Sequence, residues 1–279
     1  MPEFYVIEHT NNCNLRCKTC PNRLDNRERG FMSHEMFKNI ADQLKANNEH
    51  RTRLVLHGTG EPLLNPNLFD NLDYLERNEF GCVDFSTNGN LLTKEKAERL
   101  VKYKCLNFVK VSLNSSRKEI MEDLNTGSNY DRVIENIRGF LQAKEEAGSS
   151  LNIVVQLMQT PKNESETEEE VYNAIGRRDF QILHKRMNNF SGLVDENEYT
   201  YPGEIFWNGE CVFADKATLI QWDGDLVGCC NDNTKLQIFG NIKDGIFSEN
   251  VKAKRELLKQ QLKNGDYTNL PICKKCLAK

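Results

Sequence analysis

The sequence predicts an α/β fold in which about six strand–helix units form a partial barrel, followed by a small C-terminal α+β extension. Three observations lead to this prediction. Short apolar runs alternate with amphipathic helical stretches up to about residue 185, which is typical of parallel strands joined by crossover helices. Residues 186–210 lose this periodicity and are rich in Asn, Gly and aromatic residues. With 279 residues, the chain has room for one full-sized domain and a smaller module.

Each unit of the expected barrel begins with a short apolar run that is typical of a strand. These runs lie at residues 4–7, 54–57, 82–86, 108–112, 151–158 and 181–183. Helices are expected between them, near residues 34–44, 68–75, 93–103 and 117–146. Ser33 is the expected N-cap of the first helix. The acidic run at residues 164–170, with five Glu in seven residues, is interpreted as the solvated first turn of a further helix.

The C-terminal part is expected to contain a hairpin and a helix. Two apolar runs, at residues 218–222 and 226–229, flank an Asp-Gly-Asp turn signal. A helix is expected near residues 249–262. We therefore divide the chain into three parts. They are a barrel at residues 1–185, a linker lining the substrate site at residues 186–210, and a small domain at residues 211–279.

Composition and charge narrow the possible locations and partners. The 37 Lys and Arg residues against 41 Asp and Glu give a net charge of −4, which does not favour a phosphate backbone as a partner. No apolar run approaches the roughly 18 residues of a membrane span, and the N-terminus lacks the basic and apolar regions of a signal peptide. We therefore expect a cytoplasmic protein with no membrane partner and with little affinity for nucleic acid.

Ten cysteines in a chain without an export signal favour metal ligation over disulfide bonds, because cytosolic reductants keep thiols from pairing. Cys13, Cys17 and Cys20 lie in a loop directly after the first expected strand. Three thiolates at this spacing can hold three corners of a four-iron cluster and leave the fourth iron open to a substrate. A zinc site completed by His9, or a set of buried structural cysteines, is the alternative.

A second group of cysteines comprises Cys211, Cys229, Cys273 and Cys276. Four thiolates suit either an iron–sulfur cluster or a tetrahedral zinc ion. Consecutive strand residues point to opposite faces, so only one of Cys229 and Cys230 is expected to reach the metal, and we assign Cys229. Cys230 is then either a packing residue or a catalytic thiol that donates a hydrogen atom near the substrate. Cys82 and Cys105 are interpreted as core residues.

Two motifs resemble those of the radical S-adenosylmethionine (SAM) superfamily. Residues 13–22 are similar to its cluster loop, and residues 57–62, His-Gly-Thr-Gly-Glu-Pro, are similar to its glycine-rich motif. The resemblance implies a partial (β/α)6 barrel and a [4Fe-4S] cluster whose open iron binds SAM and cleaves it to a 5′-deoxyadenosyl radical. It also implies that Gly60 and Glu61 bind the amino group of SAM, although an ordinary turn before a helix is the alternative. Thr19 departs from the family, which more often has an aromatic residue there.

Polar residues end the third and fourth expected strands. They are Ser86, Thr87, Asn88 and Ser112. Parallel sheets bind ligands at the carboxyl ends of their strands. The resemblance implies that these side chains contact the ribose or the carboxylate of SAM, and the alternative is that they are polar turn residues.

The order of elements after residue 210 resembles the auxiliary-cluster domain called SPASM, in its short form, twitch. The shared features are a cysteine, a hairpin with an Asp-Gly turn, a second cysteine, the run at residues 240–242, a helix and a Cys-x-x-Cys pair. The resemblance implies one auxiliary [4Fe-4S] cluster held by the second group of cysteines. It further implies a flavodoxin- or ferredoxin-type electron donor.

Among twitch enzymes, the chain most resembles the aminocyclitol (2-deoxy-scyllo-inosamine) dehydrogenases. This implies that the radical abstracts a hydrogen from a small polar molecule, which is then oxidised with the auxiliary cluster as electron acceptor. Modification of a peptide by epimerisation or crosslinking is one alternative. Modification of a nucleoside or nucleic acid is another, because a basic cluster could meet a phosphate. It comprises Arg177, Arg178, His184, Lys185 and Arg186.

A non-enzymatic protein is the alternative from a different class, either an iron–sulfur electron carrier or a zinc scaffold. Such a protein would have no use for Gly60 and Glu61. The identity of the substrate, an oxidative or redox-neutral outcome, and the oligomeric state are left open by the sequence. His184, Arg186 and Glu204 are candidates for lining the substrate site.

Overall fold

The structure is a computed structural model that describes residues 2–187, 190, 194, 198–201, 211–232 and 235–277. The strands of this described part form one sheet in the order β6-β5-β4-β3-β2-β1-β7-β8-β9. They are β1 Phe4–Ile7, β2 Arg53–Val55, β3 Val83–Thr87, β4 Leu106–Asn114, β5 Asn152–Gln159, β6 Gln181–Arg186, β7 Ala217–Ile220, β8 Asp225–Val227 and β9 Ile238–Asn241. Each of the six strands expected from the alternation of apolar runs is present.

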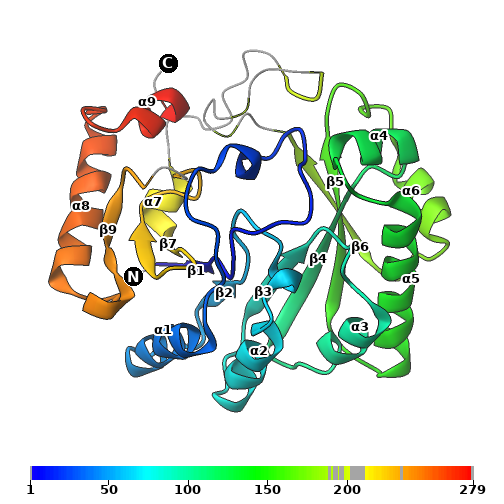
Figure 1. Cartoon of the computed structure of the whole chain (residues 1–279), viewed down its shortest axis with the longest axis horizontal. Coiled ribbons are helices and arrows are strands. Elements are labelled where there is room, and N and C mark those ends of the chain that lie inside the picture. Colours follow the sequence, from blue (N-terminus) through cyan, green and yellow to red (C-terminus); the bar gives the residue numbers. More distant parts are fainter. Residues whose placement is uncertain are drawn as a thin grey trace.

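Figure 1 shows the helices of the described part of the chain, of which those of the barrel cover the outer side of the curved sheet. They are α1 His34–Ala46, α2 Leu68–Arg77, α3 Lys94–Leu100, α4 Lys118–Leu124, α5 Tyr130–Glu146, α6 Glu168–Ile175, α7 Val212–Lys216, α8 Glu249–Lys263 and α9 Pro271–Leu277. Strands β1 to β6 are parallel throughout, and β6 is an edge strand. The predicted partial barrel of strand–helix units is confirmed.

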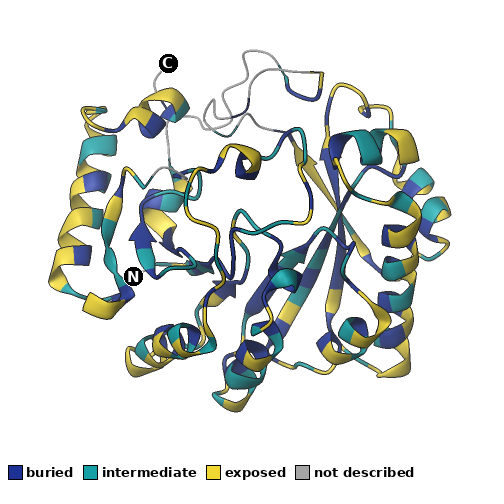
Figure 2. Cartoon of the chain, in the orientation of Figure 1, coloured by how far each residue is buried: buried dark blue, intermediate teal, exposed yellow. Residues whose placement is uncertain are grey.

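The main core lies between the sheet and the helices. Alternate residues of β4, namely Val109, Val111 and Leu113, are fully buried in it. Figure 2 shows the corresponding division of the helices, with buried faces toward the sheet and exposed faces outward. Because successive strand residues point to opposite faces, the remaining residues of these strands face the inside of the barrel.

Local capping interactions explain where several helices begin. Ser33 accepts a hydrogen bond from the Met36 backbone N–H at 3.1 Å, which confirms the expected N-cap of α1. Thr167 and Glu170 form a capping box at the start of α6, whose first turn is acidic as expected. Glu166, from the same acidic run, instead accepts a hydrogen bond from the Ser115 hydroxyl at 2.8 Å and ties down the loop after β4.

The C-terminal extension continues the sheet of the barrel. Strand β7 pairs in parallel with β1, from Phe4 opposite Ala217 to Ile7 opposite Ile220. Strands β7 and β8 form the predicted hairpin, and Gly224 in its turn has φ +88°, which favours glycine. The pairing of β7 with β1 was not expected from the sequence. The three-part division of the chain remains a prediction, since most of residues 186–210 lie outside the described residues.

Two further observations concern the ends of elements and the membrane. Strand β2 ends at Val55, earlier than the expected 57, because the chain then turns so that Gly58 packs against the Glu8 side chain. In the described part of the chain, no helix combines the length and apolarity that a membrane span requires.

Candidate active site

The three N-terminal cysteines lie in the loop that follows β1, and residues 9–33 of this loop are called the cluster loop below. The Leu15 backbone N–H is 3.4 Å from the Cys13 Sγ atom, a geometry that suits a thiolate acceptor. Burial raises the pKa of Cys17, and the nearby Cys20 and Cys13 raise it further. Burial also raises the pKa of Cys20 to about 11. Three neighbouring, half-buried thiolates need a positively charged metal core to become stable, so these residues fit a cluster.

His9 does not join this group of thiols. It is fully buried, and its ring packs edge-on against Phe37 of α1 with centroids 5.1 Å apart. Burial lowers the pKa of His9 to about 3, so its imidazole is neutral. No three His, Cys, Asp or Glu side chains among the described residues are arranged to hold a single metal ion. The alternative zinc site with His9 therefore has no support, whereas the thiolates of a four-iron cluster each bind a different iron and stand farther apart.

Glu61 joins the ends of two strands beneath the cluster loop. It is buried, and its Oε1 atom accepts hydrogen bonds from the Thr87 hydroxyl at 2.8 Å and the Leu63 N–H at 3.1 Å. Its Oε2 atom accepts one from the Asn88 N–H at 2.7 Å. The Asn88 side-chain amide lies 4.0 Å from the Cys13 Sγ atom. Glu61, Thr87 and Asn88 are all predicted to bind SAM. The structure brings these three residues together with the cluster loop.

Gly60 allows a close approach of two backbone segments. A Cβ atom at this position would lie 2.2 Å from the Thr10 carbonyl oxygen and 2.5 Å from that of Asn12. The next N–H, of Glu61, donates to the same Asn12 carbonyl at 2.8 Å. The glycine is therefore required by the packing of the cluster loop itself, and its predicted contact with SAM remains a prediction.

Ser86 and Ser112 lie on the inner face of the barrel, on β3 and β4. The Ser86 hydroxyl is buried without a hydrogen-bond partner in the described part of the chain. Ser112 is half-buried and lies opposite Gln156 of β5. Neither side chain belongs to the Glu61 network, and their assignment to SAM remains a prediction.

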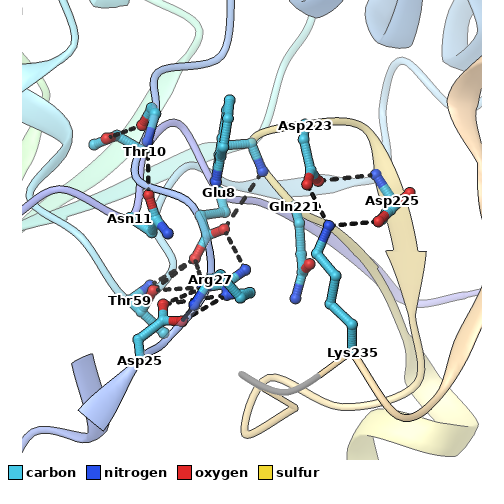
Figure 3. Close-up of polar contacts among 12 residues, drawn as sticks. Glu8, Thr10, Asn11, Asp25, Arg27, Thr59, Gln221, Asp223, Asp225 and Lys235 are labelled. Atoms are coloured by element: carbon cyan, nitrogen blue, oxygen red, sulfur yellow. Dashed lines mark hydrogen bonds and ion pairs between the residues drawn. The ribbon is translucent and has the colours of Figure 1, made fainter. Parts of the chain in front are cut away.

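A buried ion-pair network connects the cluster loop to the end of β1, as Figure 3 shows. Arg27 contacts both carboxylate oxygens of Glu8, at 3.0 and 3.1 Å, and contacts Asp25 at 2.7 Å. All three side chains are at most 7% exposed. Glu8 also accepts a hydrogen bond from the Thr59 hydroxyl at 2.7 Å, within the glycine-rich motif. This network was not expected from the sequence, although Glu8, a charged residue directly after a buried strand, was a signal for it.

The hairpin of the extension also contacts the cluster loop. A Cβ atom on Gly30 would lie 2.2 Å from the Trp222 ring, so the indole packs directly on the Gly30 backbone. The Trp222 backbone N–H lies 3.4 Å from the Glu8 Oε2 atom. Gly30 and Trp222 are far apart in the sequence, and no motif linked them.

The second group of cysteines is assembled from three separate elements. Cys211 caps α7 and accepts a hydrogen bond from the Ala214 N–H at 3.4 Å, and Cys273 of α9 accepts one from the Gln237 amide at 3.3 Å. Burial raises the pKa of Cys211 to about 11, with contributions from the nearby Cys229 and Cys273 thiols. Cys276 adds to the raised pKa of Cys273. The predicted ligands are thus neighbours, and their donors and burial suit an iron–sulfur cluster.

Cys229 and Cys230 follow β8 and are not part of it. The strand ends at Val227, so the strand alternation used to separate the two thiols does not apply to them. The assignment of Cys229 as the ligand therefore remains a prediction. Cys229 accepts a hydrogen bond from the Asn231 N–H at 3.3 Å, and its pKa is raised by a hydrogen bond with Cys230 and by burial. Cys230 packs against an apolar cluster that includes Leu219, which favours its packing role.

The basic cluster near α6 divides between two faces of the sheet. Arg177 pairs with Glu145, Arg178 with Glu169 and His184 with Glu168, at 2.5 to 3.2 Å. These exposed pairs are the solvated face beside the acidic run, and His184 therefore points away from the inside of the barrel. The Arg186 guanidinium lies 4.1 Å from the Tyr201 ring centroid. Lys185 faces the inside of the barrel, and Glu204 lies outside the described residues.

Residues 7–171 match the radical SAM superfamily, and residues 211–277 match the iron-sulfur cluster-binding domain SPASM. The chain is similar to the mycofactocin maturase MftC of Mycobacterium tuberculosis, with 29% identity over 154 residues. The match covers 55% of this chain and 38% of the maturase, which is well under two thirds of that relative's length.

Two solved structures share the fold. One is BtrN in complex with AdoMet and 2-DOIA, with a TM-score of 0.67, 20% identity, and coverage of 99% of this chain and 93% of BtrN. The other is Streptococcus suis SuiB bound to the precursor peptide SuiA, with a TM-score of 0.67, 17% identity, and coverage of 91% of this chain and 65% of SuiB.

Proposed function

The chain belongs to the radical SAM superfamily, and on that premise we propose that it oxidises a small polar molecule after abstracting a hydrogen atom from it. As a radical SAM protein with a SPASM domain, it carries [4Fe-4S] clusters and binds SAM. In this proposal Cys13, Cys17 and Cys20 hold the SAM-binding cluster, and the second group of cysteines holds the auxiliary cluster. When bound, these groups supply a 5′-deoxyadenosyl radical and, in the auxiliary cluster, an acceptor for one electron.

The oxidation balances in atoms and electrons. The carbon of a secondary alcohol gives up one hydrogen atom, which ends in 5′-deoxyadenosine. The resulting carbon radical loses one electron and its hydroxyl proton, and the C–O bond becomes the C=O bond of a ketone. In this proposal a flavodoxin- or ferredoxin-type donor supplies the electron that starts each turnover. The electron that the substrate radical loses needs an acceptor, which is the auxiliary cluster in this proposal. A redox-neutral isomerisation would not need such an acceptor.

One observation carries the proposal: the second group of cysteines belongs to a module built directly onto the strand that leads into the cluster loop. Strand β7 pairs with β1 in parallel. Trp222 packs on Gly30, and Glu8 contacts both Arg27 of the cluster loop and the backbone of the hairpin. A module attached in this way suits an electron acceptor that serves the same substrate.

The residues around Glu61 have a positioning role in the proposed reaction. Their hydrogen bonds join the ends of β2 and β3 to the cluster loop, so the loop is fixed before any substrate binds. A preformed site of this kind lowers the cost of holding reactants in their reactive geometry. Thr87 and Asn88 support Glu61, and their direct contact with SAM remains part of the proposal.

Modification of a peptide is the second candidate function. It is favoured by the shared fold with SuiB, which was solved with a precursor peptide, whereas BtrN was solved with 2-DOIA. The two candidates differ in the size of the substrate. They share the radical and the two cluster sites, so an experiment on substrates separates them.

The test is anaerobic reconstitution with iron and sulfide, followed by dithionite and SAM. We expect 5′-deoxyadenosine by mass spectrometry, and a protein that forms none would overturn the proposal. A substrate screen then compares secondary alcohols that carry amino or acidic groups with peptides encoded beside the gene. A small-molecule product two mass units lighter, with deuterium transferred from its carbon to 5′-deoxyadenosine, supports oxidation. Turnover of peptides alone supports the second candidate.

A further inference from the structure

The inside of the barrel carries polar side chains at the middle of β3 to β6. Lys110 and Ser112 alternate with the core residues of β4 and therefore face inside. The strand register sets Ser86 of β3 opposite Lys110, and Gln156 of β5 opposite Ser112. Lys185 of β6 lies on the same face, opposite Met158. These residues come from four neighbouring strands and meet on one surface.

Lys110 is a half-buried cation without a partner in the described part of the chain. The nearby Arg53 differs, because it forms an ion pair with Asp84. The charge of Lys110 is opposed by Lys185 and Arg53 and favoured by Asp84 alone. Because Asp84 is already paired with Arg53, the ammonium of Lys110 is poorly compensated, and a partly buried charge of this kind usually has a partner.

Three buried polar atoms near this cation also lack partners within the described residues. They are the Ser86 hydroxyl, the Gln156 Oε1 atom and the His57 Nδ1 atom. Gln156 is 4% exposed, and its amide nitrogen donates to the Asn114 Oδ1 atom at 3.2 Å. That bond fixes the orientation of the amide and leaves its oxygen as an acceptor. Buried polar groups without partners are rare, and a bound molecule is one explanation for them.

A conformational feature supports the Gln156 amide. Asn114, which accepts its hydrogen bond, has φ +68° at an irregularity in the pairing of β4 with β5. A non-glycine residue in this region costs energy and is held by its surroundings, and irregularities of this kind often lie next to binding sites. Asn114 also donates to the Asn125 side chain at 2.9 Å, which holds it in place.

This surface is accessible from the β6 edge of the sheet. Leu183 lies between Gln181 and Lys185 on the inner face and is 43% exposed. Lys185 is exposed as well. An exposed leucine on the inside of the barrel means that solvent reaches this edge of the inner face.

We propose that Lys110 and Ser86 bind an oxyanion, a carboxylate or a phosphate, of the substrate, while Gln156 accepts a hydrogen bond from a hydroxyl or ammonium group of the same molecule. The inference rests on the proposed function, and it narrows the substrate to small molecules that carry both an oxyanion and such a donor. Lys110 lies opposite Ser86 and two residues before Ser112, and neither Lys110 nor Gln156 is among the residues predicted to contact SAM. Ser86 was predicted to contact SAM, and this proposal assigns it to the substrate instead.

The protonation of Lys110 agrees with this assignment. Burial, followed by the charges of Lys185 and Arg53, lowers the pKa of Lys110 to about 8. Asp84 also faces this group, and His57 stays neutral because burial lowers its pKa to about 3. The ammonium form binds the anion, so affinity is present below pH 8 and falls as the pH rises through it. Binding near pH 8 then takes up protons.

The test measures anion binding to the reconstituted full chain by calorimetry at pH 7. The probes are inorganic phosphate, acetate, and glycolate, which adds a hydroxyl group to a carboxylate. Lys110→Met should weaken binding of the preferred oxyanion by about tenfold or more, because a charge-assisted hydrogen bond is lost. Lys110→Arg should retain binding, and Lys94→Met, on the exposed surface of α3, is the matched control. Equal affinity of wild type and Lys110→Met would overturn the proposal.

A second variant tests Gln156, the proposed acceptor of a hydrogen bond from the ligand. We expect glycolate to bind more tightly than acetate to the wild type, and Gln156→Met to abolish this difference. Preference of phosphate over both carboxylates would assign the oxyanion as a phosphate, and the reverse as a carboxylate. A difference that persists in Gln156→Met would contradict the role of Gln156.

Chemical labelling reports on Lys110 itself, whereas calorimetry reports on anion binding anywhere on the protein. An amine-reactive reagent at pH 8 should label Lys110 readily, and the bound anion should protect it by about fivefold or more. Lys94 should show no protection. Labelling of Lys110 that is unchanged by any of the three anions would overturn the proposal.

SAM cleavage separates this inference from the proposed function. Formation of 5′-deoxyadenosine without substrate should be the same within about twofold in wild type and Lys110→Met. A wild type that cleaves SAM but binds no oxyanion contradicts the inference alone. A wild type that does not cleave SAM contradicts the proposed function, whatever its anion binding. Loss of SAM cleavage in Lys110→Met would assign Lys110 to SAM and overturn the inference.

Discussion

The two groups of cysteines are assembled in different ways. Cys13, Cys17 and Cys20 lie in one loop, and each is within four residues of the next. The second group takes Cys211 from the start of α7, Cys229 from the segment after β8, and its last pair from α9. The first group is therefore placed by local chain geometry, and the second by packing between elements far apart in the sequence.

The surroundings of the two cysteine groups also differ. The cluster loop is held by a buried network of charged groups, Glu8, Arg27 and Asp25, and by the Glu61 carboxylate. The second group sits in a smaller apolar cluster that contains Leu258 and Leu270. The comparison indicates that the loop depends on a few strong polar contacts, whereas the extension depends on strand pairing and helix packing.

The largest effect is expected when the first group of cysteines is removed and the second group is kept. The triple variant Cys13→Ala, Cys17→Ala and Cys20→Ala should form 5′-deoxyadenosine only at background level, because no SAM-binding cluster remains. Its iron content should fall from about eight to about four per chain, with the auxiliary signal retained. Iron analysis and electron paramagnetic resonance measure both. Cys82→Ala is the control, and loss of all iron in the triple variant would contradict two independent sites.

The next effect tests the ligand assignment within the second group. Cys229→Ser should remove the auxiliary cluster and lower the iron content to about four, whereas Cys230→Ser should keep about eight. The physical reason is that Cys229 lies near Cys211 and Cys273, while Cys230 packs in an apolar cluster. The same iron analysis decides, and the reverse pattern would reassign the ligand to Cys230.

A third prediction concerns the polar network of the cluster loop. Arg27→Met should lower the free energy of unfolding by about 3–5 kcal/mol, because it leaves the buried carboxylates of Glu8 and Asp25 without their partner. Chemical denaturation measures the change. Arg178→Met is the control, since it removes an exposed pair with Glu169 and should cost about 1 kcal/mol or less. An equal effect of both variants would show that the network contributes little.

The smallest expected effect lies at the contact between the two regions. Gly30→Ala should lower the free energy of unfolding by about 1–3 kcal/mol, because its methyl group would overlap the Trp222 ring. Gly139→Ala is the matched control in α5, where no atom lies within 4 Å of the new methyl, and it should stabilise by about 0.5–1 kcal/mol. Trp222 fluorescence should shift in the first variant alone. An unchanged spectrum in Gly30→Ala would contradict the packing of the indole on the loop.

Much of the barrel and of its chemistry was predictable from the sequence. The strand and helix patterns are local, so the six parallel strands, the Ser33 cap and the hairpin at Gly224 were expected and are present. The cysteine spacings and the glycine-rich motif indicated the family, which the matched domains confirm. The position of Cys229 relative to β8 was predicted wrongly, because element ends depend on small local energies.

Contacts between distant segments were not predictable in the same way. Nothing in the sequence linked β7 to β1, Trp222 to Gly30, or Arg27 to Glu8, because each contact joins residues that only the folded chain brings together. Lys110 and Lys185 are similar cases, since their shared face follows from the strand register.

The sequence by itself determined the kind of chemistry, because the thiol spacing that predicts metal ligation and the alternation of strands and helices are both short-range patterns. The tertiary structure decided where the two thiol groups lie relative to each other and which side chains face the inside of the barrel. The physical reason is that strand pairing and burial are set by long-range packing. This packing leaves Lys110 and Gln156 with groups that have no partner among the described residues, which their own sequence neighbours do not reveal.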